Sequence, residues 1–288
     1  MPLIPTIIVD LIMARLVAVL ILYSLLGLLG QVQADSSVSP SHSRIELTIP
    51  VHVFTNATKI AFDTPRNQTQ LTGLLQEAFS VTSNVSVLQI GTIPLNASYQ
   101  IFGELFVPDN WKENGTGVLE FAVHGYVWQH PVQKQRYQLT IKFRLNLDRT
   151  YWSIDGSASP LNYVESSLKA GHAIFVFDRL GSGQSSKPDG IKEVQTAVHI
   201  PVIDSVNSFL RNGVQGFSFK TIVGIGHSYG SFLLAALAAN VPDALDAIVL
   251  TGFTVDTQSA NHTAFVQVLH LYSKPAAELH YSGSGLHD

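Results

Sequence analysis

Apolar and polar positions follow two different patterns along the chain, and the change falls near residue 117. Residues 43–53 and 98–107 show a broken alternation of apolar and polar side chains with many β-branched residues. That pattern predicts antiparallel strands. After residue 117 the apolar runs are continuous, and they lie at 118–123, 173–177, 221–225 and 247–250. Because continuous runs suit strands that are buried on both faces, they predict a parallel sheet.

Stretches with helical spacing separate these apolar runs. Residues 162–170, 194–211 and 232–239 are predicted helices, and 71–79 is a short predicted helix within a region rich in Asn and Thr. Strands that alternate with helices are typical of the α/β class. The chain is therefore predicted to form a mostly parallel central sheet with helices on both faces, preceded by antiparallel N-terminal strands.

The first 34 residues have the features of a secretory signal peptide. An uncharged apolar run at 16–29 follows Arg15, and Ala34 is a small residue suited to a cleavage site. The run is shorter than the roughly 18 apolar residues that a membrane-spanning helix needs. Since the signal is best formed from Met13 onward, residues 1–12 are interpreted as an upstream extension. An uncleaved anchor that holds the protein to a membrane is the alternative.

Six acceptor sequences for N-glycosylation support a eukaryotic secretory route. Each has the pattern Asn-x-Ser/Thr, and behind a signal peptide they predict a secreted, extracellular glycoprotein whose acceptor segments lie at the surface. The acceptor residues are Asn56, Asn67, Asn84, Asn96, Asn114 and Asn261.

Composition removes several classes of function. The 288 residues include 17 basic and 21 acidic side chains, and the net charge of −4 offers no basic field for nucleic acid. The absence of cysteine excludes disulfides, cysteine-based zinc sites, iron–sulfur clusters and thiol nucleophiles. The sequence also contains no metalloprotease, phosphate-loop or dinucleotide-binding motif. We therefore expect neither a metal nor another cofactor.

A pentapeptide of the form G-x-S-x-G directly follows the predicted strand at 221–225 and precedes a predicted helix. It reads Gly226-His227-Ser228-Tyr229-Gly230. A strand–turn–helix context of this kind predicts a nucleophile elbow, in which a serine occupies a strained turn and its hydroxyl is exposed. The flanking glycines leave room where side chains would collide with neighbouring backbone. The sequence therefore predicts Ser228 as a nucleophile.

Two other predicted strands end in loops that matter for such a site. His124, Gly125 and Tyr126 follow the run at 118–123, where the backbone N–H of Tyr126 would form an oxyanion hole with that of Tyr229. The loop at 178–185 has the pattern D-x-x-G-x-G-x-S. We interpret it as a structural turn without chemistry of its own.

The order of these three motifs resembles the α/β-hydrolase superfamily, in its secreted serine esterase and lipase-like branch. The resemblance covers about residues 98–253. It implies acyl transfer from an ester through Ser228, with the Tyr126 and Tyr229 amides as oxyanion hole. Related epoxide hydrolases and haloalkane dehalogenases carry aspartate at the elbow, so a serine there argues against those activities.

The remaining members of a catalytic triad are harder to find. In this fold the acid and the histidine follow the serine in chain order. Only 38 residues follow Leu250 (288 − 250), whereas two more strands with their crossovers need on the order of 60. Asp256 is a candidate acid, and none of the later histidines follows a recognisable strand. The chain is therefore expected to be truncated, with 254–288 as a tail or the start of a lid, and its catalytic histidine is unidentified.

A second departure from the family pattern lies between the first two motifs. Family members typically reach a Tyr-Trp pair within about ten residues of the HG loop, but Tyr151 and Trp152 come 26 residues after Gly125. The intervening stretch 131–149 holds 5 of the 17 basic residues in 19 positions. An intron retained in frame is the favoured explanation, and a genuine β-hairpin insertion is the alternative.

These observations divide the chain into a signal peptide (1–34), an N-terminal β-rich segment (35–97), a hydrolase core (98–253) and the C-terminal stretch. The favoured function is a secreted serine hydrolase with little or no activity, acting on a small-molecule or lipid ester. The alternative is a catalytically dead ligand-binding protein on the same scaffold. Apart from an N-terminal anchor we expect no stable membrane partner, and the oligomeric state does not follow from the sequence.

Overall fold

A computed structural model describes residues 41–61, 69–70, 73, 89–114, 116–125, 148–154, 159 and 161–253. The chain divides into two units, 1–39 and 40–288, and every described residue belongs to the second. The predicted signal peptide, most of the stretch 131–149 and the C-terminal stretch 254–288 therefore lie outside the described residues.

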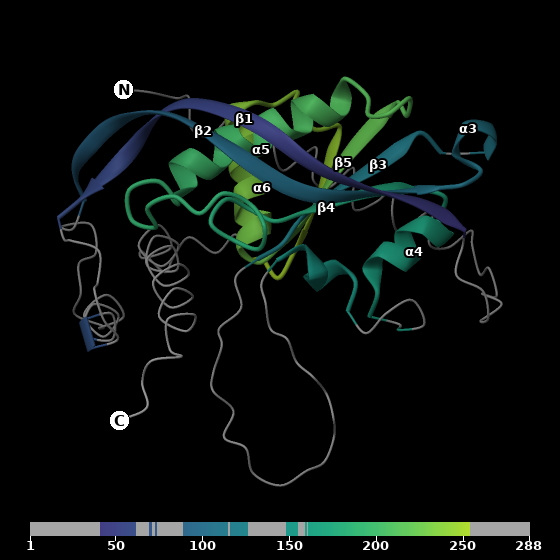
Figure 1. Ribbon diagram of the computed structural model, residues 1–288, viewed down its shortest axis with the longest axis horizontal. Coiled ribbons are helices and arrows are strands. Elements are labelled where there is room, and N and C mark those ends of the chain that lie inside the picture. Colours follow the sequence, from purple (N-terminus) through teal and green to yellow (C-terminus); the bar gives the residue numbers. More distant parts are fainter. Residues whose placement is uncertain are drawn as a thin grey trace, which may run out of the picture. The chain divides into compact units, whose positions relative to one another are not determined.

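The described strands form one mixed sheet, with the order β1-β2-β4-β3-β5-β6 (Figure 1). The strands are β1 (His42–Ile60), β2 (Gln89–Pro108), β3 (Val118–Val123), β4 (Ala173–Phe177), β5 (Thr221–His227) and β6 (Ala247–Thr251). β1 pairs antiparallel with β2, and β2 pairs antiparallel with β4. β4, β3, β5 and β6 pair parallel in that spatial order. This confirms the predicted α/β class, with antiparallel strands first and a parallel core after them.

The helices of the described part lie between these strands, as the alternation of patterns predicts. They are α3 (Trp111–Asn114), α4 (Tyr163–Lys169), α5 (Thr196–Arg211), α6 (Tyr229–Asn240) and a 3₁₀ helix, η2 (Arg149–Trp152). Asn162 begins α4, because its side-chain oxygen accepts a hydrogen bond from the Glu165 amide at 3.0 Å. Among the helices described, none combines the length and the apolar character of a bilayer-spanning segment.

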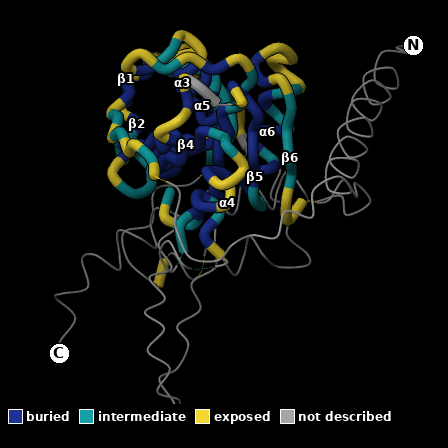
Figure 2. The backbone as a smooth tube through the Cα atoms, turned by 90° about the vertical axis from the view of Figure 1, so that its right-hand side faces the viewer, coloured by how far each residue is buried: buried dark blue, intermediate teal, exposed yellow. Residues whose placement is uncertain are grey.

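Two apolar clusters occupy the two faces of the sheet. Alternate residues of each strand point to opposite faces, so Phe121 of β3 and Phe175 of β4 join one cluster while Ala122 and Ile174 join the other. α5 and α6 contribute to the first cluster, and α4 and η2 contribute to the second. β3, β4 and β5 are accordingly buried along most of their length, whereas β6, at the edge of the sheet, is half-buried (Figure 2).

The two N-terminal strands are longer than the sequence pattern predicts. The alternation of apolar residues suggests strands at 43–53 and 98–107, but β1 extends to Ile60 and β2 begins at Gln89. Their outer parts continue the same antiparallel pairing. Residues 54–60 of β1 are mostly polar, and Gly91 and Pro94 interrupt the apolar residues of β2, so the sequence pattern does not predict either extension. β2 also runs across position 97, so the N-terminal segment 35–97 and the core share this strand.

Candidate active site

Ser228 lies in the turn between the end of β5 and the start of α6. Its backbone has φ 52° and ψ −117°, and a positive φ is costly for a residue with a Cβ atom. The Ser228 amide donates a hydrogen bond to the carbonyl oxygen of Thr251, at the end of β6, at 2.8 Å. The strained turn is therefore tied to the neighbouring parallel strand.

The flanking glycines are required by the close packing of backbone around this turn. A Cβ atom on Gly226 would lie 2.6 Å from the Cα of Ser231 in α6. A Cβ atom on Gly230 would lie 2.7 Å from the carbonyl carbon of Val123, at the end of β3. Both distances are shorter than van der Waals contact, so only glycine lets α6 start this close to the two strands.

The HG loop after β3 lies directly against Ser228. A Cβ atom on Gly125 would be 2.9 Å from the Cβ of Ser228 and 2.7 Å from the carbonyl oxygen of His227. Gly125 is the last described residue of this loop, and Tyr126 lies outside the described residues. The structure thus brings the described part of the predicted oxyanion loop next to the predicted nucleophile. The role of the Tyr126 amide stays a prediction.

His124 holds this loop as a neutral, buried ring. Its Nδ1 lies 3.0 Å from the carbonyl oxygen of Gly125, and its Nε2 accepts a hydrogen bond from the Arg179 amide at 3.3 Å. One nitrogen donates and the other accepts, which is the pattern of an uncharged imidazole. Complete burial, helped by the charge of Arg179, lowers the pKa of His124 well below its usual value. The ring is therefore a structural support of the site.

Arg179 clamps the same loop from the other side. Its Nε donates to the carbonyl oxygen of His124 at 2.9 Å, and its Nη2 donates to that of Gly125 at 3.0 Å. The guanidinium carbon lies 5.0 Å from the centre of the Tyr229 ring, within cation–π range. The side chain is almost completely buried. The loop at 178–185 therefore fixes two carbonyl groups beside Ser228, a task that its sequence pattern does not reveal.

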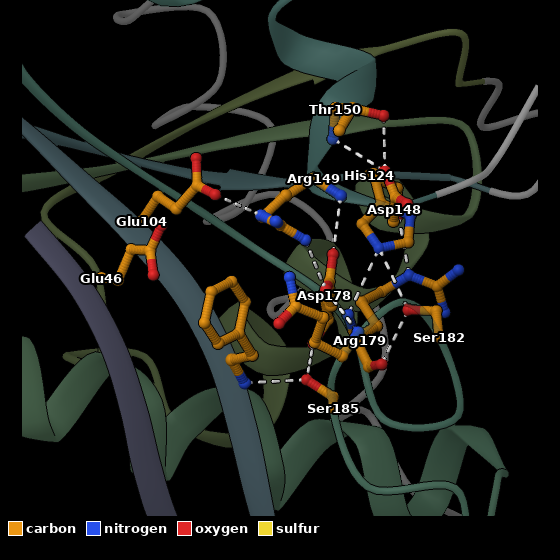
Figure 3. Close-up of polar contacts among 12 residues, drawn as sticks. Glu46, Glu104, His124, Asp148, Arg149, Thr150, Asp178, Arg179, Ser182 and Ser185 are labelled. Carbon is orange, nitrogen blue, oxygen red and sulfur yellow. Dashed lines mark hydrogen bonds and ion pairs between the residues drawn. The ribbon is translucent and has the colours of Figure 1, made fainter. Parts of the chain in front are cut away.

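Asp178, next to Arg179, anchors this loop through a buried ionic network (Figure 3). Its carboxylate accepts hydrogen bonds from the Arg149 amide at 2.9 Å, from Arg149 Nη1 at 2.8 Å and from the Gln184 amide at 2.7 Å. Arg149 Nε also donates to Glu104 at 2.7 Å, and Arg44 reaches Glu104 at 2.9 Å. Burial raises the pKa of Asp178, and the hydrogen bonds from Arg149 and Gln184 oppose that rise. Arg149, the last residue of the stretch 131–149, is thus built into the core.

Tyr151 packs against the turn that carries Ser228. Its ring stacks on the His227 ring with centroids 4.9 Å apart, and His227 Nδ1 lies 3.1 Å from the Thr251 hydroxyl. Burial lowers the pKa of His227. The Tyr-Trp pair is recognisable in the sequence. Because it lies 26 residues after Gly125, the sequence does not predict that Tyr151 contacts His227.

Several other predicted residues are not placed by the structure. Asp256, the candidate acid, lies outside the described residues, as do Asn67, Asn84 and Asn261. Asn56 is exposed on β1 and Asn96 on β2, while Asn114 ends α3. Within the described ranges, no group of three or more histidine, aspartate or glutamate side chains could hold a metal ion.

Comparison with known proteins identifies a family pattern that contains the elbow. Residues 154–278, which include Ser228, match the family model described as alpha/beta hydrolase fold. This agrees with the strand order and with the turn geometry around Ser228. No curated protein matches the chain.

Solved structures similar to the chain include enzymes of two activities. An epoxide hydrolase from an endophytic Streptomyces is 21% identical over 52% of this chain and 33% of that chain, with a TM-score of 0.34. An esterase from Exiguobacterium antarcticum is 14% identical over 53% of this chain and 41% of that chain, with a TM-score of 0.33. A thermophilic esterase from Thermogutta terrifontis is 21% identical over 58% of this chain and 46% of that chain, with a TM-score of 0.35. The chain thus spans between 33% and 46% of the length of these three structures.

Proposed function

We propose that this protein is a serine hydrolase that cleaves a small-molecule or lipid ester by acyl transfer through Ser228. The α/β-hydrolase fold of residues 154–278 supports hydrolysis as the general chemistry. Serine at the elbow supports an acyl-enzyme mechanism, because a hydroxyl can form a covalent ester with the substrate's acyl group.

The observation that carries this proposal is the backbone of Ser228. A non-glycine residue with φ 52° costs folding energy, yet two neighbouring glycines and the Thr251 carbonyl hold it in this conformation. Strain of this kind is what exposes a nucleophilic hydroxyl at the carboxyl edge of a parallel sheet.

The proposed reaction has two steps. Ser228 Oγ attacks the ester carbonyl carbon while a base takes the hydroxyl proton, and the alcohol leaves with a proton returned from that base. Water then attacks the acyl-enzyme, releases the carboxylic acid and restores Ser228. The amide of Tyr229, at the start of α6, and the amide of Tyr126 would stabilise the negative oxygen in both steps.

The identity of the base motivates a second candidate function. His124 and His227 lie beside Ser228, but His124 bonds to Gly125 and Arg179, and His227 stacks on Tyr151. Neither ring is placed as a general base. Asp256 remains the proposed acid and the histidine is unassigned. The second candidate is therefore a ligand-binding protein that uses the same site without catalysis.

A fluorophosphonate probe distinguishes the two functions, because it reacts covalently only with an activated serine. Because neither histidine beside Ser228 is placed as a general base, we expect weak labelling of the full chain at Ser228. We expect Ser228→Ala to abolish this labelling together with the hydrolysis of p-nitrophenyl butyrate that depends on the hydroxyl. Ser208→Ala, at an exposed position of α5, is the matched control and keeps full labelling.

Two results would contradict the hydrolase proposal. Labelling that persists in Ser228→Ala would show that another residue is the nucleophile. Neither labelling nor hydrolysis by the wild-type chain, together with saturable binding of p-nitrophenyl butyrate, would favour the binding protein.

Secretion is proposed on the sequence of residues 1–34 alone. Expression of the full chain in a eukaryotic cell tests it, because the secreted protein should begin at Asp35. A protein retained on membranes with an intact N-terminus would favour the uncleaved anchor.

A further inference from the structure

Phe54 occupies an unusual position in the middle of β1. It exposes 77% of its surface, more than any of the other large apolar side chains in the described part of the chain. Its neighbours along the strand, Val51 and Val53, are 3% and 1% exposed. A phenylalanine this exposed buries little apolar surface within the fold, so its ring is available for a contact from outside.

The two faces of β1 have different surroundings. Thr55 donates a hydrogen bond to the carbonyl oxygen of Ala197 in α5 at 3.1 Å, and Ala57 is buried. Because side chains alternate along a strand, Phe54 and Asn56 lie on the opposite face, turned away from α5. Both residues are exposed there.

Two glycosylation acceptors share this outward face with Phe54. The register pairs Phe54 with Asn96 of β2, and Asn56 with Pro94. Asn56 follows Phe54 by two residues, about 7 Å along the strand, and Asn96 lies directly across from it. Both begin acceptor sequences, Asn-Ala-Thr at Asn56 and Asn-Ala-Ser at Asn96.

We propose that Asn56 carries an N-linked glycan and that the first N-acetylglucosamine of this glycan packs on the Phe54 ring. The C–H face of a pyranose is apolar and matches the face of an aromatic ring. A side chain two residues away on the same strand lies at the distance of a neighbouring group, so the sugar can lean over the ring without moving the backbone. Asn56 is chosen over Asn96 because threonine is a better third residue of an acceptor than serine.

The position of β1 gives this glycan a physical purpose. β1 is the outermost strand of the sheet, and a long edge strand with an exposed aromatic residue can pair with another copy and aggregate. The long ribbon of β1 and β2 is visible across Figure 1. A glycan at Asn56 covers Phe54 and blocks the approach of a second strand to this edge.

The modification is a group transfer from a lipid-pyrophosphate-linked oligosaccharide in the lumen of the secretory pathway. The amide nitrogen of Asn56 bonds to C1 of the first sugar and loses a proton, while the bond from C1 to the pyrophosphate oxygen breaks and the lipid pyrophosphate leaves. Transfer takes place on the extended chain before folding, so Thr58 need not be accessible in the folded protein. The inference rests on the proposed secretion and not on the proposed hydrolase activity.

The first test is site occupancy in the full chain secreted by a eukaryotic cell. Mass spectrometry after treatment with peptide N-glycosidase in ¹⁸O-water should show Asn56 converted to labelled aspartate. Asn56→Gln should remove one glycan, and Asn96→Gln, the matched control on the same face, should leave Asn56 occupied. An unmodified Asn56 in the secreted protein would overturn the proposal.

The second test asks whether Phe54 supports the sugar. After trimming by endoglycosidase H, which leaves one N-acetylglucosamine on each site, the wild-type chain should melt about 2–4 °C above Asn56→Gln. This difference should disappear in a Phe54→Ser background and persist in Ile93→Ser, which removes another exposed apolar side chain of the ribbon. A difference that survives Phe54→Ser would overturn the contact.

Discussion

At the scale of single residues, the strained serine is the feature from which the proposed function follows. Ser228 adopts a backbone conformation that is costly for a residue with a Cβ atom. The residues next to Ser228 predict the turn, because G-x-S-x-G between a strand and a helix is a recognisable pattern. The contacts that maintain the strain, from Thr251 and from the HG loop, involve residues far away in the sequence.

The strain can be measured directly. Ser228→Gly should raise the free energy of unfolding by about 1 kcal/mol, because glycine tolerates the positive φ, and it should abolish fluorophosphonate labelling. Ser228→Ala is the control, since it loses the hydroxyl and keeps the strain. Urea denaturation gives both values, and equal midpoints for the two variants would show that the turn stores no strain.

The glycine at position 230 provides a second test at this scale. Gly230→Ala should cost about 3 kcal/mol, because its Cβ would meet the backbone carbonyl groups of Val123 and His124, which cannot move aside. Gly216→Ala is the matched control. Gly216, unlike Gly230, has a positive φ of 84°, but a Cβ there meets open space, so the cost of the backbone conformation alone should be about 1 kcal/mol. Similar losses in both variants, by urea denaturation, would contradict the packing argument.

At the scale of elements, the buried ionic network joins η2, β2 and the loop after β4. Patterns of apolar residues locate the core strands well, because a buried parallel strand needs an uninterrupted apolar run. Apolar patterns do not predict that Arg149 belongs to the core, because the residues that precede it in the sequence are rich in basic side chains. Only the folded arrangement shows that this side chain neutralises Asp178 and Glu104.

Replacing Arg149 or Arg44 singly tests which of the two arginines contributes more to stability. Arg149→Met should cost about 3–5 kcal/mol, because it leaves the carboxylate of Asp178, whose side chain is completely buried, without its charged partner. Arg44→Met is the matched control. Arg44 binds the same Glu104 but its side chain is 51% exposed, so the loss should stay below about 1 kcal/mol. If Arg149→Met and Arg44→Met lowered the urea midpoint equally, the buried ion pair of Arg149 would contribute no more stability than the exposed one of Arg44.

At the scale of the whole molecule, the buried histidine makes stability depend on pH. Burial lowers the pKa of His124 well below 6.5 in the folded state, whereas the unfolded chain takes up a proton near pH 6.5. As the pH falls through 6.5, the unfolded state gains a proton that the folded state does not. The free energy of unfolding should therefore decrease, by up to about 1.4 kcal/mol per pH unit. The lowered pKa of His227 acts in the same direction.

Urea midpoints between pH 8 and pH 5.5 measure this effect. The wild-type midpoint should fall below pH 6.5, and His124→Asn should show a shallower decrease, since asparagine does not titrate and its amide can keep the hydrogen bond to the Gly125 carbonyl oxygen. Both proteins are first compared at pH 8, where neither state of His124 is protonated. Identical slopes in the two proteins would mean that His124 does not contribute to the acid sensitivity.

The sequence by itself determined the α/β class, the four parallel core strands and the position of the elbow at Ser228. These features are local, because the period of apolar residues and the glycines of a turn reflect constraints within a few residues of each other. The tertiary structure alone decided that Arg179 clamps the HG loop, that Arg149 joins the core, and that Phe54 and Asn56 share an outward face. Those relations depend on residues brought together from distant segments by strand order and register, and no local pattern encodes them.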